Sequence, residues 1–135
     1  MERITSFTID HDVLVPGFYI SRKDGDITTY DLRTRRPNKG DYMSNADMHS
    51  VEHMFATYIR NSEIADSIIY FGPMGCQTGF YLLVRDVEPK KVFQITKEVL
   101  SQIIAHEGEV FGASAAECGH YENLDLEIAK EECRT

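Results

Sequence analysis

The sequence predicts an α+β fold in which helices pack against an antiparallel β-sheet. Several short runs rich in β-branched and aromatic residues are bounded by turn-forming residues, as the strands of hairpins are. Longer stretches repeat apolar residues at the spacing of an amphipathic helix. The order along the chain is three strands, one helix, two strands and two helices, which is typical of this fold class.

The N-terminal third of the chain predicts three strands. They are expected at residues 5–9, 18–23 and 27–34, where β-branched and aromatic side chains are frequent. The sequence DGD at residues 24–26 is a hairpin signal, because Asp and Gly accept the geometry of a tight turn. A loop should follow at residues 35–40, which contain Pro, Asn and Gly.

A helix is predicted from about residue 45 to residue 61. Ser44 or Asn45 can cap its N-terminus, and Asp47 complements the positive end of the helix dipole. One face of this helix is apolar and the opposite stripe is largely polar. The apolar face comprises Met48, Val51, Phe55, Tyr58 and Ile59, and the other stripe comprises His49, Glu52, His53, Ala56 and Arg60.

Two paired strands and two helices are predicted in the second half of the chain. The strands span residues 67–74 and 80–87, and a tight glycine-bounded loop joins them. A helix should begin at Pro89 and stop before Gly108, and a short acidic helix should span residues 124–132. The apolar face of the longer helix comprises Val92, Ile95, Val99, Ile103 and Ile104.

The composition predicts one soluble domain over residues 1–135, since the chain has 135 residues and no repeat or linker divides it. A net charge of -8 does not supply the cationic surface that a nucleic-acid partner needs. No apolar run is long enough to span a membrane, and residues 1–10 lack the apolar core of a signal peptide. With three cysteines, an odd number, we expect a cytoplasmic protein without membrane association.

The residues most indicative of chemistry are HSVEH at positions 49–53, on the first predicted helix. Residues four apart lie one above the other on a helix, so His49 and His53 can direct both imidazoles at one cation with Glu52 beside them. This order is the inverse of the zincin HExxH motif, in which imidazoles bind metal and a carboxylate moves protons. The motif predicts a metal site, although two histidines on a solvated helix would give the same pattern.

Two cysteines are candidates for the same chemistry, because a catalytic metal usually has three protein ligands and one open position. Cys118 is a candidate third ligand, since thiolate binds zinc or iron strongly; the alternative is a buried, inert cysteine. Cys76 lies at the tip of the loop at residues 75–79. An accessible thiol there can act as a proton carrier or nucleophile, or it can be a simple turn residue.

Two further groups are ambiguous from the sequence. A basic run at residues 33–39 could bind an anionic or polyhydroxyl ligand, but such runs more often form a solvated loop face. It comprises Arg33, Arg35, Arg36 and Lys39. The three remaining histidines are isolated in the sequence, and a structural role is favoured over metal binding for each of them: His11, His106 and His120.

Six segments together carry a family resemblance. They are SFTIDH at residues 6–11, YDLR at 30–33, RPN at 36–38, HSVEH at 49–53, PMGCQTGFY at 73–81 and ECG at 117–119. The chain resembles the S-ribosylhomocysteine lyase (LuxS, autoinducer-2 synthesis) family over nearly its whole length, and HSxEH followed by PMGCQTG is highly specific. One departure is YFG at residues 70–72, where many relatives carry an acidic residue and then Ser.

The resemblance implies cleavage of S-ribosylhomocysteine to homocysteine and 4,5-dihydroxypentane-2,3-dione, by aldose–ketose isomerisations followed by β-elimination. It also implies a homodimer with active sites at the subunit interface, and one divalent metal per chain, Fe²⁺, for which Zn²⁺ or Co²⁺ can substitute. The implied site residues are the metal ligands His49, His53 and Cys118, the acid/base pair Glu52 and Cys76, and Ser6, His11 and Arg33 around the ribosyl group.

Two other functions are compatible with the helix motif. In an HxxEH peptidase, the third ligand would be Glu127, Glu131 or Glu132, and Glu52 would activate a water molecule. Such an enzyme should keep its metal when Cys118 is replaced. In a non-catalytic metal-binding module, protein side chains would fill every metal position, and Glu52→Gln should change little.

Overall fold

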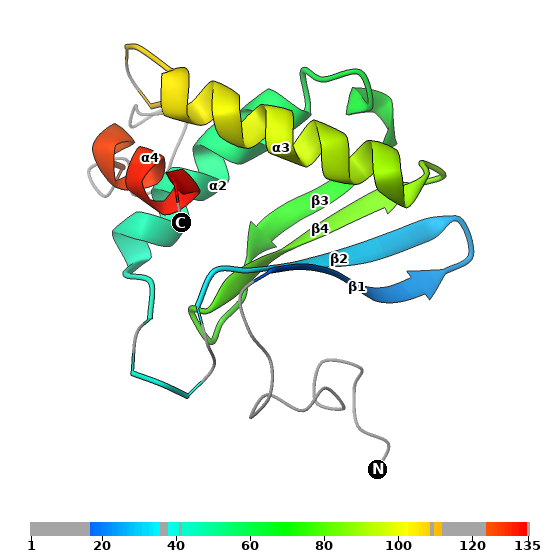
Figure 1. Cartoon of the computed structure of the whole chain (residues 1–135), viewed down its shortest axis with the longest axis horizontal. Helices are drawn as coiled ribbons and strands as arrows, with labels where there is room; N and C mark the ends of the chain where they lie inside the picture. Colours follow the sequence, from blue (N-terminus) through cyan, green and yellow to red (C-terminus); the bar gives the residue numbers. More distant parts are fainter. Residues whose placement is uncertain (1–16, 36–37, 41, 109, 112–123, 135) are drawn as a thin grey trace.

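The computed structural model describes residues 17–35, 38–40, 42–108, 110–111 and 124–134 (Figure 1). The strand predicted at residues 5–9 lies outside these ranges. The elements are strands β1 (Gly17–Asp24) and β2 (Ile27–Arg33), helix α2 (Asn45–Ile59), the short 3₁₀ helix η1 (Ala65–Ser67), strands β3 (Ile68–Pro73) and β4 (Gly79–Arg85), and helices α3 (Pro89–Ala105) and α4 (Leu126–Arg134). The predicted α+β class is confirmed.

The described strands form one antiparallel sheet in the order β1-β2-β4-β3. The two predicted hairpins, β1 with β2 and β3 with β4, are both present. They are joined by pairing of β2 with β4, which places Asp31 opposite Tyr81 and Arg33 opposite Gly79. This central pairing, which the turn signals did not specify, brings the end of β2 beside the loop that carries Cys76.

The two faces of the sheet have different roles, because side chains alternate along each strand. Helices α2, α3 and α4 all lie on one side of the sheet (Figure 1). On that side the ring of Phe71 stacks on Phe55 of α2, with ring centroids 4.2 Å apart, and on Phe80 of β4 at 5.2 Å. The other face carries Asp31 and Arg33, and no helix in the described part of the chain covers it.

Helix α2 begins where the sequence predicts. Ser44 is its N-cap, and Ser44 and Asp47 each donate a backbone N–H to the other's side chain at 3.0 Å. Its predicted apolar face is buried except for Tyr58, which is half-buried. The opposite stripe is half-buried up to Ala56, and Arg60 is exposed. The HSVEH residues therefore lie on a well-anchored helix, at the margin of the core.

Helices α3 and α4 complete the helical layer. Helix α3 begins at Pro89 as predicted and ends at Ala105, and four of its five predicted apolar residues are buried while Ile104 is half-buried. Helix α4 packs against both α2 and α3. The backbone N–H of Asp125 donates to the buried Ser50 Oγ at 2.7 Å, so the serine of HSVEH has a structural role. No helix in the described ranges has the length and apolar character needed to cross a membrane.

An ion pair connects α4 to the sheet. Arg35, which follows β2, donates through Nη1 to Glu132 Oε2 at 3.1 Å and through Nη2 to Glu132 Oε1. The side chains are only 15% and 7% exposed, so water screens the pair weakly. Removing either partner would leave a largely buried charge, which makes this contact a strong constraint on where α4 docks.

Candidate functional site

The two histidines of HSVEH are adjacent, as their spacing on a helix requires. The ring centroids of His49 and His53 are 4.6 Å apart and the ring planes are nearly perpendicular, at 89°. Both side chains are half-buried, as is Glu52 one turn from His49. Among the described residues, no hydrogen bond or ion pair reaches the Glu52 carboxylate.

The His53 ring is oriented by a backbone carbonyl. Its Nδ1 lies 2.8 Å from the carbonyl oxygen of Phe111. A carbonyl can only accept a hydrogen bond, so Nδ1 carries the proton and donates it. In the neutral imidazole the free lone pair then lies on Nε2. Metal-binding histidines commonly use one nitrogen in this way and bind through the other, so His53 fits the role of a metal ligand.

Three predicted site residues lie outside the described ranges: Ser6, His11 and Cys118. Within those ranges, no three His, Cys, Asp or Glu side chains form a group that could hold a metal ion. The carboxylates of α4 thus do not complete a site with the two histidines, and Glu132 binds Arg35 instead. The geometry gives no support to the third ligand that the peptidase alternative requires.

Cys76 lies in the turn between β3 and β4, and the residue is exposed. Its Sγ is 2.9 Å from Thr78 Oγ1, and Arg33 Nη1 donates to that same oxygen at 2.7 Å. Because the Thr78 oxygen accepts from Arg33, its own proton is available to donate to the sulfur. Thr78, only 1% exposed, therefore bridges a guanidinium group and a thiol.

Arg33 is held by Asp31 as well as by Thr78. Its Nε donates to Asp31 Oδ1 at 3.2 Å and its Nη2 donates to Asp31 Oδ2 at 2.6 Å. Both residues are buried, and the two-residue period of a strand puts them on one face. Arg33 thus supports the Cys76 loop through Thr78, and its side chain is only 1% exposed. Sequence reasoning missed Asp31 and Thr78, although the DxR spacing on a strand was an available signal.

The Cys76 loop is also tied to the start of α2. Gln77 has a φ of +65°, a conformation uncommon for residues other than glycine. Two hydrogen bonds hold it there: Met43 N–H donates to the Gln77 carbonyl at 3.0 Å, and Gln77 Nε2 donates to the Met43 carbonyl at 2.8 Å. Met43 directly precedes Ser44, the N-cap of α2. These hydrogen bonds to Met43 therefore fix the position of the Cys76 loop relative to the start of the HSVEH helix.

Tyr81 belongs to the same surroundings. It lies on β4 opposite Asp31 and is half-buried. Burial raises the pKa of the Tyr81 hydroxyl above its usual value, the charges of Asp31 and Cys76 raise the pKa further, and Arg33 opposes them. The hydroxyl is accordingly neutral at physiological pH and can donate a hydrogen bond.

The basic run at residues 33–39 is not a single cationic surface. Arg33 is buried against Asp31, and Arg35 is paired with Glu132 across to α4. Lys39 is exposed, and Arg36 lies outside the described residues. The expectation of a solvated loop face is thus wrong for both described arginines, because Arg33 neutralises Asp31 on its own strand and Arg35 neutralises Glu132 on α4.

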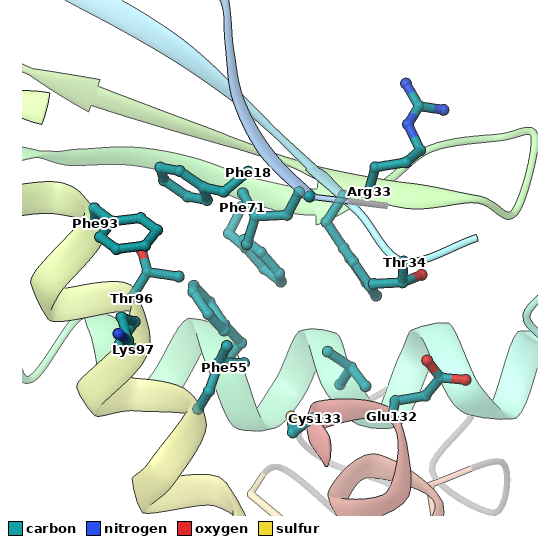
Figure 2. Close-up of a pocket in the computed structure, with 15 residues that line it drawn as sticks. Phe18, Arg33, Thr34, Phe55, Phe71, Phe93, Thr96, Lys97, Glu132 and Cys133 are labelled. Carbon is teal, nitrogen blue, oxygen red and sulfur yellow. The ribbon is translucent and has the colours of Figure 1, made fainter. Parts of the chain in front are cut away.

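A cavity of about 400 Å³ lies between the sheet and the helices, and its lining is mostly aromatic and aliphatic. Figure 2 shows Phe18, Phe71 and Phe93 around it, whereas the guanidinium group of Arg33 points away to the other side of the sheet. None of His49, Glu52, His53 and Cys76 lines this cavity. The cavity is therefore separate from the HSVEH residues and from the Cys76 thiol, although the backbone end of Arg33 belongs to its lining.

The chain matches a known family over nearly its whole length. The profile of S-ribosylhomocysteinase (LuxS) matches residues 4–135. An S-ribosylhomocysteine lyase from Clostridium beijerinckii is 46% identical over 136 residues, covering 96% of this chain and 86% of the relative. A protein of the same name from Finegoldia magna is 46% identical, with the same coverage of each chain. Another from Borreliella burgdorferi is 45% identical, covering 98% of this chain and 88% of the relative.

Proposed function

This chain belongs to the S-ribosylhomocysteinase (LuxS) family, and from that premise we propose that it cleaves S-ribosylhomocysteine to homocysteine and 4,5-dihydroxypentane-2,3-dione, the precursor of autoinducer-2. The family match over residues 4–135 is the observation that carries the proposal. The geometry supports it, because the loop with Cys76 is hydrogen-bonded to the segment that starts the HSVEH helix.

The reaction requires repeated proton transfer at carbon. The substrate carbonyl moves from C1 to C2 and then to C3, and each move takes a proton from one carbon and returns one to its neighbour. In the last step a proton leaves C4, the C5–S bond breaks, and homocysteine departs with the bonding electrons on sulfur. The site therefore needs acid/base groups beside the bound sugar chain.

Glu52 and Cys76 are the groups that we propose for these transfers. The Glu52 carboxylate is half-buried and makes no hydrogen bond or ion pair with the residues the structure describes, so it is available as a base. The Cys76 residue is exposed, and its sulfur lies within hydrogen-bonding distance of the Thr78 hydroxyl. A hydrogen bond from this hydroxyl can stabilise the thiolate that forms when Cys76 gives up its proton. Arg33, with Ser6 and His11, would bind the ribosyl group.

We propose that His49, His53 and Cys118 hold one divalent metal per chain, Fe²⁺, with Zn²⁺ or Co²⁺ able to replace it. The adjacent rings of the two histidines and the free Nε2 of His53 support this assignment. When bound, the metal would act as a Lewis acid for the negative charge that develops on the sugar oxygens. His53 would keep its orientation throughout, because the Phe111 carbonyl holds Nδ1.

We further propose that the chain is a single catalytic domain that forms a homodimer. We place this homodimer in the cytoplasm. The sheet face that no described helix covers supports the dimer, because it presents Tyr19, Tyr81 and Leu83, and Tyr70 is 50% exposed on it. An uncovered face rich in large apolar side chains is a candidate interface. Sites at that interface would lie close to Arg33 and Cys76.

The proposed activity is tested by measuring free thiol released from S-ribosylhomocysteine, together with metal content. Glu52→Gln and Cys76→Ala should abolish thiol release while one divalent metal per chain remains bound. Glu127→Gln and Cys133→Ala are matched controls that should keep full turnover. Full turnover in Glu52→Gln or Cys76→Ala would remove that residue from the mechanism. Retention of metal by Cys118→Ala would favour a different third ligand.

A further inference from the structure

Three ring side chains gather beside His53. They come from α2, from the residue after α3 and from the segment that follows: Tyr58, His106 and Phe111. The ring centroid of Phe111 is 5.4 Å from that of Tyr58 and 4.8 Å from that of His106. All three pairs are tilted edge to face, an arrangement that favours each aromatic contact. We call these three residues the aromatic clamp.

A hydrogen bond closes the clamp. The Tyr58 hydroxyl and His106 Nδ1 lie 2.7 Å apart, and the hydroxyl donates when that ring nitrogen carries no proton. His106 is the C-cap of α3, and its backbone N–H donates to the Ile103 carbonyl at 3.1 Å. The last turn of α2 is therefore connected to the end of α3, and the Phe111 ring packs against both partners.

The clamp determines where one particular carbonyl lies. Phe111 lies in a turn, outside the helices and strands of the part of the chain that the structure describes. Its ring contacts with Tyr58 and His106 anchor it to α2 and to the end of α3. The carbonyl of this same residue accepts the Nδ1–H of His53 at 2.8 Å. The packing of the Phe111 ring thus determines the orientation of the His53 imidazole on α2.

We propose that Tyr58, His106 and Phe111 are positioning residues that hold His53 with its proton on Nδ1 and its Nε2 free for the metal. The inference rests on the metal site of the proposed function, and it adds residues that lie outside the HSVEH motif. None of the three has to touch metal or substrate. A cluster that only filled space would contribute to stability and leave the His53 ring as it is.

The first test examines the metal-free protein. Long-range ¹⁵N–¹H NMR spectra of histidine-labelled chain report which ring nitrogen of His53 carries the proton. The unaltered chain should show the Nδ1–H form, and Tyr58→Leu and His106→Leu should each show a mixture of both forms. Ser62→Ala is the matched control, because it removes a 2.6 Å hydrogen bond to the Ile59 carbonyl at the end of the same helix without touching the clamp.

The second test measures the dissociation constant for Co²⁺ by optical titration of the metal-free chain. Tyr58→Leu and His106→Leu should raise Kd about 10-fold or more, in the range seen when the outer partner of a ligating histidine is lost. Tyr58→Phe, which keeps the ring, should raise Kd only a few-fold, and Ser62→Ala should leave it unchanged. If a leucine variant fails to fold, Tyr58→Phe and His106→Gln give the same comparison, with a several-fold rise expected.

Failure of the clamp can be distinguished from failure of the metal site. If the variants keep both the Nδ1–H form and the unaltered Kd while His53→Ala loses Co²⁺, the clamp is overturned and the metal site stands. If His53→Ala binds Co²⁺ as tightly as the unaltered chain, the proposed metal site is wrong, and the clamp proposal fails with it.

Discussion

At the scale of single residues, Thr78 joins two candidate site residues, Arg33 and Cys76, through one oxygen atom. One oxygen accepts from Arg33 at 2.7 Å and lies 2.9 Å from the Cys76 sulfur. The buried guanidinium group of Arg33 is neutralised by Asp31. Its hydrogen bond to Thr78 polarises the Thr78 hydroxyl, which is the group beside the Cys76 sulfur. The Thr78 hydroxyl can therefore affect both the position of the Cys76 loop and the protonation of the Cys76 thiol.

Thr78→Val keeps the shape of the side chain and removes the hydroxyl. We expect kcat for thiol release to fall roughly tenfold, because the sulfur loses a hydrogen bond worth about 1.4 kcal/mol. The free energy of unfolding should also fall by about 1–3 kcal/mol, since one N–H of Arg33 is left without its partner. Steady-state thiol release and urea unfolding measure the two effects.

Thr78→Ser is the matched control for this change, because it retains the oxygen and should retain most of the activity. A valine variant that is destabilised but turns over at the unaltered rate would show that the hydroxyl only supports the loop. Equal losses in the serine and valine variants would show that activity depends on the whole threonine side chain, which would contradict the specific role given to the hydroxyl.

At the scale of elements, the pairing of β2 with β4 assembles the thiol site. Gly79 sits at the start of β4 opposite Arg33. A Cβ at that position would lie 2.5 Å from the Leu32 carbonyl oxygen and 3.1 Å from the Arg33 Cα. Both neighbours are backbone atoms, which cannot move away without shifting strand β2. The close approach of the two strands therefore requires glycine at this position.

Gly79→Ala should lower the free energy of unfolding by about 1–3 kcal/mol, as overpacking of a tight contact does. It should also slow thiol release, because displacement of β2 moves Arg33 away from Thr78. Gly75→Ala is the control for stability, since a Cβ there meets nothing within 4 Å, and its free energy of unfolding should stay within about 0.5 kcal/mol. Similar unfolding curves for the two variants would contradict the role given to Gly79.

At the scale of the whole molecule, the helices that the structure describes all lie on one face of the sheet, and the opposite face is the one that we propose for association. The Arg35–Glu132 pair and the Asp125–Ser50 hydrogen bond keep α4 on the helical side. Large side chains on the opposite face, among them Tyr70 and Leu83, form the surface that we propose for contact with a second copy of the chain. Burying such a face is the usual driving force for a symmetric dimer.

The dimer is tested by placing a charge in the centre of this face. The unaltered chain should have twice the 15.4 kDa mass of one chain in light scattering. Leu83→Glu should shift the mass toward that of a single chain, because an unpaired carboxylate would be buried at the interface. Gln102→Glu adds the same charge on the exposed side of α3 and should leave the dimer intact. A dimer that survives Leu83→Glu would place the interface elsewhere.

The sequence predicts correctly those features that depend on residues close together in the chain. The capping residue Ser44, the start of α3 at Pro89 and the DGD hairpin depend on contacts between residues a few positions apart. The i, i+4 pairing of His49 and His53 follows from helix geometry in the same way. Such features require only the short-range conformational preferences of the chain, and the identities of neighbouring residues supply those.

What the amino-acid sequence determined by itself was the fold class, most element positions and the residue types of the candidate site. Only the tertiary structure decided which carboxylate neutralises Arg35, that Thr78 joins Arg33 to Cys76, and that Phe111 orients His53. The contacts of Arg35 with Glu132, Arg33 with Thr78 and His53 with Phe111 join residues 97, 45 and 58 positions apart. The entropic cost of closing a loop changes slowly with its length, so many alternative long-range pairings have nearly the same entropic cost for the unfolded chain. Burial of the whole core selects one of them.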